Sequence, residues 1–427
     1  MTDHTRLEEV ERGSPGGFLQ VSAADREVLR RLAGRVAELA SRPIEAEKRD
    51  LWYRHNALEA TRAVIFCDPE NGWNEIITPD QMVCSGELAR GWEVHLRKEI
   101  FWAESMCDDR VAEPHFDVSH VHKDTGWGLE HTVIRPGPGG AYRWDSPIKD
   151  LDDLTGLRSP TITVGQKATE ALLDLADGVL GDLLPVRLNT HWWWSLGMTQ
   201  PLIYLRGLNQ IMLDMLDNPR GLHRLMAFIA DAHRARLDFL EGEGLLCLNN
   251  DGDYVGSGGF GYSRELPAAD FAGRVRPCDM WGFGESQETA VISPAMFEEF
   301  VFHYQLPLLE RFGLNCYGCC EPLDKRWHVV QKTPRLRRVS VSAWADVADM
   351  AEKLGDRHIY SFKPSPTDLA MPTFDEERIR AYLRRALELT RGCRVEIVMK
   401  DNHTIGNDPT RVTRWVRIAR EEAERAG

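Results

Sequence analysis

The stretch LNCYGCCEPLDKRWHVVQKTPRLRRVSVSA, residues 314–343, holds two short β-prone runs separated by enough chain for a crossover. The runs are LNCYG (314–318) and RRVSVSA (337–343), and two more follow, HIYSF (358–362) and RVEIVM (394–399). Longer segments with helical character lie between them. Strands that alternate with helices predict parallel strands joined by crossover connections.

The same alternation extends toward the N-terminus through four further runs: RAVIFC (62–67), PVRLNT (185–190), LLCLNN (245–250) and PCDMWGF (277–283). Helix starts are predicted at Asn218–Pro219, Ser293–Pro294 and Asp375, and two earlier helices over about 23–40 and 86–104. Eight runs predict an α/β fold that closes into a (β/α)₈ barrel of TIM type. We expect residues 61–427 to form this barrel with insertions, and residues 1–60 to form a tail and helices packed on it.

Composition and charge narrow the class of protein. The chain has 427 residues, of which 43% are hydrophobic and 28% charged, as in ordinary globular proteins. Its 66 acidic residues exceed its 52 basic ones, and the net charge of −14 disfavours nucleic acid and anionic membranes as partners. The sequence shows neither a signal peptide nor a membrane-spanning run, so we expect a cytoplasmic protein. In a reducing cytosol, its nine cysteines favour free thiols or metal ligands over disulfides.

Polar residues follow nearly every predicted strand where it ends. They are Cys67–Asp68, His191–Trp192, Asn249–Asp251, Glu285 with Gln287 and Glu288, Cys319–Glu321, Trp344 with Asp346, Lys363, and Lys400–His403. In barrels of this kind the chemistry lies at the C-terminal ends of the strands. A purely structural barrel has no need of polar strand ends, so we expect the functional site at this edge.

Three of these residues are candidate metal ligands. Cys319 and Cys320 are either small buried apolar side chains or thiolates at the strand end, and thiolates suit an open zinc site. His403 is either a loop residue that caps a turn or a further zinc ligand, with Asp401 orienting its ring or contacting substrate. A second histidine group, at residues 115, 120 and 122, is interpreted as part of a surface loop.

The remaining candidates are catalytic or substrate-binding. Glu288 is either a first-turn acid that favours the helix dipole or a site carboxylate. Asp251 is either a turn former or a substrate ligand, and Lys363 either a salt-bridged support or a substrate anchor. Trp192, in HWWWSL, is either core or part of an aromatic wall, and Asn249 and Trp344 complete the predicted substrate-binding set.

One motif does not support cofactor binding. GSGGFG (256–261) matches the letters of a dinucleotide-binding loop but runs into YSRELP rather than into a helix. Without a helix N-terminus to receive a pyrophosphate, the match carries no such function.

The stretch ISPAMFEEFVFHYQLPLLERFGLNCYGCCEP (292–322) resembles the corresponding helix and strand of the uroporphyrinogen decarboxylase-like superfamily, as does the order of elements from about residue 51 onward. The resemblance implies a (β/α)₈ barrel and either decarboxylation or methyl transfer to or from a corrinoid. The corrinoid methyltransferases bind zinc through a His-x-Cys, whose place Tyr317-Gly318-Cys319 takes here, and a later ligand that would be His403. The decarboxylase's arginine-rich N-terminal signature is not visible, which favours the methyltransferase branch.

The expected function is therefore zinc-assisted methyl transfer from a small O- or N-methyl donor to cobalamin or a corrinoid protein. Cys319, Cys320 and His403 would hold the metal, Glu288 would bind it or donate a proton, and Asp251 and Lys363 would act on the substrate. The alternative is a metal-independent decarboxylase of a tetrapyrrole or aromatic acid that uses Asp251 or Lys363. A third possibility is a non-catalytic barrel that binds a corrinoid or its carrier.

Overall fold

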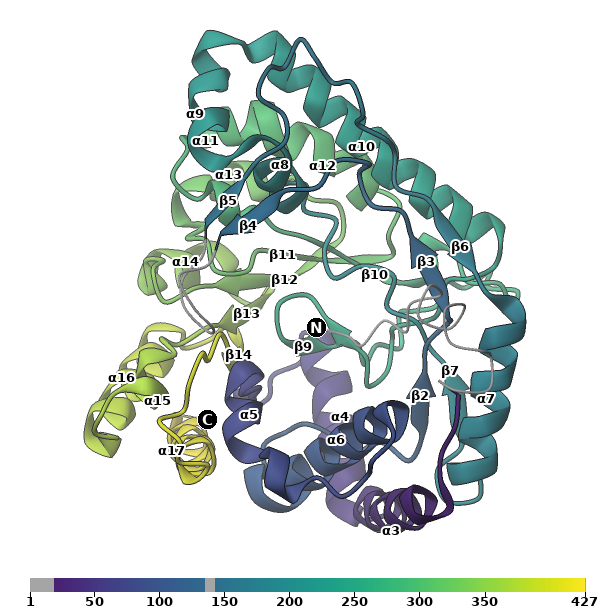
Figure 1. Ribbon diagram of the computed structural model, residues 1–427. Coiled ribbons are helices and arrows are strands. Elements are labelled where there is room, and N and C mark those ends of the chain that lie inside the picture. The colour runs from purple at the N-terminus through teal and green to yellow at the C-terminus, as the bar shows by residue number, and fades with distance from the viewer. Residues whose placement is uncertain (1–18, 135–142, 427) are drawn as a thin grey trace.

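The computed structural model describes residues 19–134 and 143–426, which form a mixed α/β fold built on a parallel sheet (Figure 1). The sheet has six strands in the order β1-β14-β13-β12-β11-β10. Their bounds are β1 Val64–Cys67, β10 Trp281–Gly284, β11 Leu314–Tyr317, β12 Leu336–Val341, β13 Ile359–Phe362 and β14 Arg394–Met399. All five pairings are parallel, as the alternation of strands and helices predicts.

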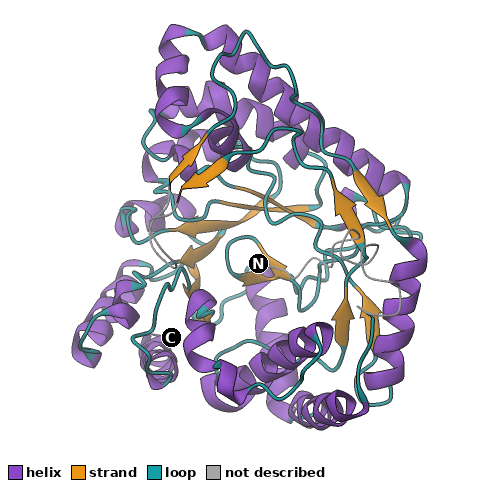
Figure 2. Ribbon diagram, viewed as in Figure 1, coloured by secondary structure: helices purple, strands orange, loops and turns teal. Residues whose placement is uncertain are grey.

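Helices connect these strands and lie mainly around the outside of the molecule, with strands and loops nearer its middle (Figure 2). After β10 come α11 (Pro294–Phe297), the π-helical turn η6 (Glu298–Phe302), α12 (His303–Leu309), α13 (Trp327–Val330), α14 (Val347–Leu354), α15 (Thr367–Ala370), α16 (Glu376–Leu389) and α17 (Thr410–Ala426). The predicted N-caps Ser293 and Asp375 each accept a main-chain N–H in the first turn of their helix. No helix in the described ranges has the length and apolarity needed to cross a bilayer.

The N-terminal helices and a large insertion make up the rest of the described chain. Their helices are α3 (Ala23–Ala40), α4 (Pro43–Asn56), α5 (Trp73–Ile76), α6 (Glu87–Phe101) with the π-helical turn η3 (Trp102–Met106), α7 (Gln166–Leu180), α8 (Thr199–Arg206), α9 (Leu208–Asp217) and α10 (Pro219–Gly242). Their strands are β2 (Phe116–Val118), β3 (His122–Asp124), β4 (Thr132–Ile134), β5 (Arg143–Asp145), β6 (Ile162–Val164) and β7 (Val186–Leu188). Strands β2 and β7 form a second parallel pair, while β3 pairs with β6 and β4 with β5 in antiparallel hairpins. Helices α8 and α10 of the insertion pack against η5 (Gln287–Thr289), η6 and α12.

Seven of the eight predicted runs contain a strand, and the prediction for residues 245–250 was wrong. The side chain of Asn249 takes the place of main-chain hydrogen bonds there. Its amide nitrogen donates to the carbonyl of Trp281 at 3.1 Å, and its amide oxygen accepts the Trp281 N–H at 2.8 Å. Strand β2 was not predicted, because its three residues lie among polar ones and its Asp117 is held by a contact with the distant Arg187 of β7. Within the described residues the six-stranded sheet ends at β1 and β10, so it is not hydrogen-bonded into a closed ring.

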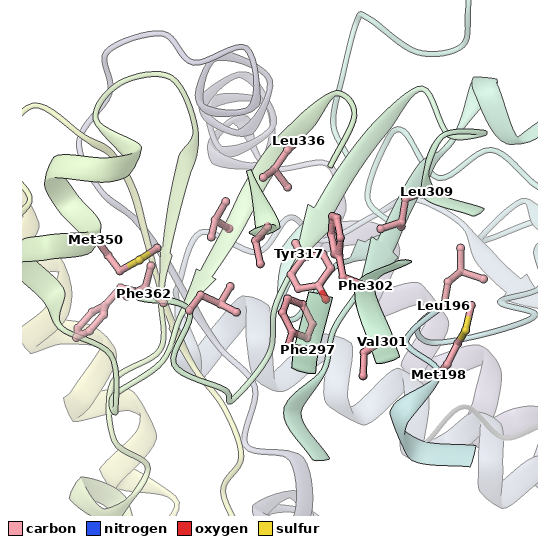
Figure 3. Packing of buried hydrophobic residues seen from close by; sticks show 14 of the residues in the cluster. Leu196, Met198, Phe297, Val301, Phe302, Leu309, Tyr317, Leu336, Met350 and Phe362 are labelled. Atoms are coloured by element: carbon pink, nitrogen blue, oxygen red, sulfur yellow. The ribbon is translucent and has the colours of Figure 1, made fainter. Parts of the chain in front are cut away.

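The main hydrophobic core lies between the sheet and the helices that follow its strands. Tyr317 of β11 is fully buried there, with its ring 6.1 Å from that of Phe302 and 6.5 Å from that of Phe297 (Figure 3). The next residue, Gly318, has φ +91°, a left-handed conformation that favours glycine. This turn places Cys319 in the small apolar cluster of Cys316, on the opposite side of the sheet from the main core.

A glycine-rich hairpin fills the space on that opposite side. It consists of β8 (Tyr254–Val255) and β9 (Gly259–Phe260), and Figure 1 shows β9 near the centre of the molecule, facing β10–β14. A Cβ atom added at Gly256 would lie 2.9 Å from Cys316 of β11, and one at Gly258 would lie 2.5 Å from Val398 of β14. The GSGGFG motif is therefore a packing element whose missing side chains let the main chain approach the sheet.

Replacing Gly258 by alanine is expected to lower the free energy of unfolding by about 1 to 3 kcal/mol, because the added methyl group overpacks against Val398. The measurement is urea unfolding followed by circular dichroism. Gly273→Ala is the matched control, since Gly273 also has a left-handed φ of +91° but has nothing within 4 Å of the added atom. Equal destabilisation by the two variants would show that backbone strain alone, and not hairpin packing, sets the effect.

Candidate functional site

The carboxyl ends of the parallel strands bring a cluster of thiols and charges together. Cys319 and Cys320 follow β11, Lys400 follows β14, and Ser257 lies at the turn of the glycine-rich hairpin. The hydroxyl of Ser257 donates to Cys319 Sγ at 3.1 Å and accepts from Lys400 Nζ at 3.1 Å. Lys400 Nζ also lies 3.8 Å from Cys319 Sγ. Three segments far apart in the sequence thus place an ammonium group and a hydroxyl beside one buried sulfur.

The pKa values of the two thiols are shifted in opposite directions, chiefly by their contact with each other. Cys320 Sγ lies 3.5 Å from Cys319 Sγ and donates to Asp401 Oδ2 at 3.1 Å. The contact between the two sulfur atoms, followed by burial and then helped by the Lys400 ammonium, lowers the pKa of Cys319 on balance, whereas the same contact raises the pKa of Cys320. Burial alone would lower the pKa of Lys400, but the negative groups around it raise that pKa well above its usual value. Cys319 Sγ thus lies beside the Lys400 ammonium, which favours its thiolate form.

Replacing Lys400 by methionine is expected to raise the pKa of Cys319 and to slow its modification by methyl methanethiosulfonate at pH 7 about tenfold for each pKa unit gained. Fragment-ion mass spectrometry resolves Cys319 from Cys320. Lys353→Met, which removes a lysine paired with Asp349, is the control and should leave the rate unchanged. An unchanged rate in the Lys400 variant would contradict the ion pair.

Three carboxyl groups form a second cluster beside the first. Glu285 follows β10, is fully buried, and accepts the Gln287 N–H at 3.0 Å and the Ser195 hydroxyl at 3.3 Å. Glu288 accepts from the Thr199 hydroxyl at 2.5 Å. Glu321 is buried and accepts the main-chain N–H groups of Ser286 at 2.8 Å and of Cys319 at 2.9 Å.

This crowding keeps Glu285 neutral. Burial, followed by the negative charges of Glu288 and Glu321, raises the pKa of Glu285 well above the usual range. Burial also raises the pKa of Glu321, although the N–H groups that it accepts oppose this shift. These surroundings favour the protonated form of Glu285, the form that a proton donor needs.

A cavity of about 450 Å³ opens beside these acids. Its wall includes Glu285 and Ser195 together with the consecutive tryptophans Trp192, Trp193 and Trp194. Trp192, predicted to be either core or part of an aromatic wall, is buried, with its ring 5.3 Å from His120 and 4.9 Å from His122, and is also among the residues that line the cavity. The interpretation of His120 and His122 as surface-loop residues was wrong, because both pack against Trp192 and are only 7% exposed.

The predicted metal ligands are only partly brought together. Cys319 and Cys320 adjoin, but the ring of His403 is exposed and its Nδ1 lies 3.5 Å from Asn71 Nδ2. A catalytic zinc ion takes three protein ligands. In the part of the chain that the structure describes, no three histidine, cysteine or acidic side chains form a group that could hold a metal ion. As placed, Cys319, Cys320 and His403 are thus not gathered around one position.

The other predicted residues occupy different surroundings. Asp251 lies 3.2 Å from Arg187, and burial, helped by Asp253, raises its pKa to about 7. Lys363 is buried and donates to the Ser361 hydroxyl, and burial lowers its pKa to about 8. Both polar atoms of the Asn249 side chain bond to the main chain of Trp281. Trp344 is 79% exposed on the surface.

Sequence reasoning missed the residues whose roles depend on distant contacts. Ser257 lies in the glycine-rich motif that carries no cofactor signal, and Lys400 was noticed only as one of many polar residues at strand ends. Ser195 carried no signal beyond its place next to three tryptophans.

Comparison with known proteins adds no further information, since no protein-family model and no curated protein matches this chain.

Proposed function

We propose that the chain is a methyltransferase of the uroporphyrinogen decarboxylase-like superfamily that moves a methyl group from a small O- or N-methyl donor to cobalamin or a corrinoid protein. The observation that carries this proposal is Glu285, a buried acid in the wall of an aromatic cavity whose surroundings favour its protonated form. A bond between methyl and oxygen or nitrogen is hard to break because the heteroatom is a poor leaving group. A proton delivered to that heteroatom removes this obstacle.

In the proposed reaction the donor occupies the aromatic cavity and its methyl group is attacked in line by the reduced cobalt of the corrinoid. The bond from methyl to the heteroatom breaks, its electron pair stays on the heteroatom, and Glu285 neutralises that atom with its proton. Ser195 connects the acid to the cavity, because its hydroxyl lies 3.3 Å from Glu285 and also lines the wall. Glu288 acts through Glu285, since its negative charge keeps the neighbouring acid protonated.

The superfamily's barrel is part of the proposal. The six-stranded sheet, strand β7 and the irregular segment 245–250 would together make the eight strands of a (β/α)₈ barrel, with β2 as an added partner of β7 and the Asn249 side chain joining segment 245–250 to β10. Reduced cobalt survives only in reducing surroundings, which supports the expected cytoplasmic location.

The decarboxylase alternative has less support. It would require Asp251 or Lys363 to act on the substrate, but Lys363 is buried against Ser361 and Asp251 is paired with Arg187. Neither of them lines the 450 Å³ cavity.

The test is methyl transfer from small methyl ethers and methylamines to free reduced cobalamin, followed by the change in the cobalamin absorption spectrum. Formation of methylcobalamin in proportion to the protein supports the proposal. Release of carbon dioxide from an aromatic acid without methylcobalamin formation would overturn it in favour of decarboxylation.

Zinc binding by Cys319, Cys320 and His403 stays a prediction, and elemental analysis of the purified protein tests it. If zinc binds there, the purified wild-type protein should contain about one zinc ion per chain. Cys320→Ser and His403→Ala should hold less. Equal zinc in all three proteins would remove these two residues from the ligand set.

A further inference from the structure

The 450 Å³ cavity has walls suited to a flat ring. Beside Trp193 and Trp194 it is lined by Trp127, His131 and Tyr204, and the rings of the last two stack with centroids 4.4 Å apart at 9°. Binding pockets for small molecules span about 300 to 1,000 Å³. A cavity at the lower end of this range has room for a ligand of one or two rings, but not for a corrin macrocycle. Aromatic walls favour stacking or edge-on contact with an aromatic ligand.

Two side-chain nitrogen atoms, one in Arg236 and one in His233, have no hydrogen-bond partner among the described residues. Arg236 is held by a 2.9 Å contact from Nη1 to Asp124 and by donation from Nη2 to the Trp192 carbonyl at 2.7 Å. Its buried Nε, however, has no hydrogen-bond partner among the described residues, and the same is true of His233 Nε2. Because a buried polar group without a partner is unfavourable, a shift of either side chain that turns its unpartnered nitrogen toward the cavity would be favoured by a ligand with a polar substituent that can bond to it.

The charges of the wall cancel. The guanidinium of Arg236 is balanced by Asp124, and Glu285 is neutral. Burial also lowers the pKa of His233 to about 4, so its ring is uncharged at neutral pH. A quaternary ammonium ligand would find no free carboxylate here, and an anionic ligand would compete with Asp124 for Arg236. An uncharged ligand meets neither difficulty.

We propose that this cavity binds an uncharged aromatic ring that carries oxygen substituents, and that the methyl donor is an aryl methyl ether. Arg236 turns its Nε–H toward one oxygen substituent. Ser195, whose hydroxyl donates to Glu285 in the structure, turns to the ether oxygen, gives it the hydroxyl proton as the methyl group leaves, and receives the proton of Glu285 in return. The products are a phenol and the methylated corrinoid, so no further oxidant or reductant is consumed. This assignment of the donor rests on the proposed methyl transfer, but binding of the aromatic ring does not.

Isothermal titration calorimetry with 2-methoxyphenol, in the absence of any corrinoid, tests the binding site. We expect saturable binding at one site per chain. Methoxycyclohexane, which lacks the aromatic ring, and choline, which is cationic, should each bind at least about tenfold more weakly. Equal binding of 2-methoxyphenol and methoxycyclohexane would overturn the aromatic site.

A pair of matched variants tests the role of Arg236. Arg236→Lys keeps the charge beside Asp124 but removes the Nε–H donor, and should weaken binding of 2-methoxyphenol about tenfold. Arg234→Lys, two residues away in an exposed ion pair with Asp231, should bind like wild type. Urea unfolding of both variants checks that they are folded. Wild-type affinity in a folded Arg236→Lys protein would overturn the assigned contact.

The two proposals fail in different ways. If 2-methoxyphenol binds as expected but no donor methylates cobalamin, the proposed methyl transfer is wrong and the aromatic site stands. If methyl transfer proceeds from a methylamine or an aliphatic ether and 2-methoxyphenol does not bind, the function stands and the aromatic donor is overturned.

Discussion

Glu285→Gln is expected to slow methyl transfer from 2-methoxyphenol to reduced cobalamin by about 10²- to 10⁴-fold, which is the usual contribution of a general acid. Glutamine has nearly the same shape and still offers an oxygen to the Gln287 N–H, but it has no acidic proton. Binding of 2-methoxyphenol, measured by calorimetry, should change little, since the aromatic walls and Arg236 are untouched. A loss confined to the rate would identify Glu285 as the proton donor.

Glu288→Gln provides a control that does not remove the acid. The negative charge of Glu288 raises the pKa of Glu285, so removing that charge lowers it. Activity that requires protonated Glu285 is present below its pKa and lost above it. The alkaline limit of the pH–rate profile should therefore move to lower pH in this variant, with the maximal rate largely kept. An unchanged alkaline limit, or full activity of Glu285→Gln, would contradict the assignment.

The second large effect is expected at Glu396, which lies fully buried on β14. It contacts Arg338 Nε at 3.0 Å and His55 Nε2 at 3.3 Å, and also accepts from Ser361. Glu396→Ala would leave the buried guanidinium of Arg338 without its counter-charge. Because an unpaired buried charge is strongly unfavourable, we expect the free energy of unfolding to fall by about 3 to 5 kcal/mol. Urea unfolding monitored by circular dichroism is the measurement.

The control is Glu298→Ala, which breaks a solvent-exposed ion pair with Lys332 and should lower stability far less. A small loss in Glu396→Ala, comparable with that of the control, would show that solvent reaches the Arg338 guanidinium when the carboxylate is removed.

The pH dependence of stability follows from the same network. Burial alone would raise the pKa of Glu396, but Arg338, His55 and Lys363 together lower it below the ordinary value. A carboxyl whose pKa is lower in the folded state stabilises the fold above its unfolded pKa, which is about 4.3. That stabilisation is lost as the pH falls through the folded pKa. Wild type should therefore lose more stability on acidification from neutral pH than Glu396→Gln does.

Local patterns in the sequence were enough to predict much of the sheet and its helices. Seven of eight strands, and the helix starts at Asn218, Ser293 and Asp375, were predicted because β-prone runs and N-caps act over only a few residues. The edge that carries the thiols and acids was also predictable, since parallel strands place all their carboxyl ends on one side.

The tertiary structure alone decided which side chains meet. Ser257 contacts Cys319, and Arg236 of α10 reaches the tryptophans near β7, although the partners in each case are tens of residues apart in the chain. It also decided that Asn249 replaces a strand's hydrogen bonds and that His403 lies beside Asn71 rather than between the two thiols. Such contacts depend on how a hairpin and a helix pack against the sheet, and no short-range pattern of residues encodes that packing.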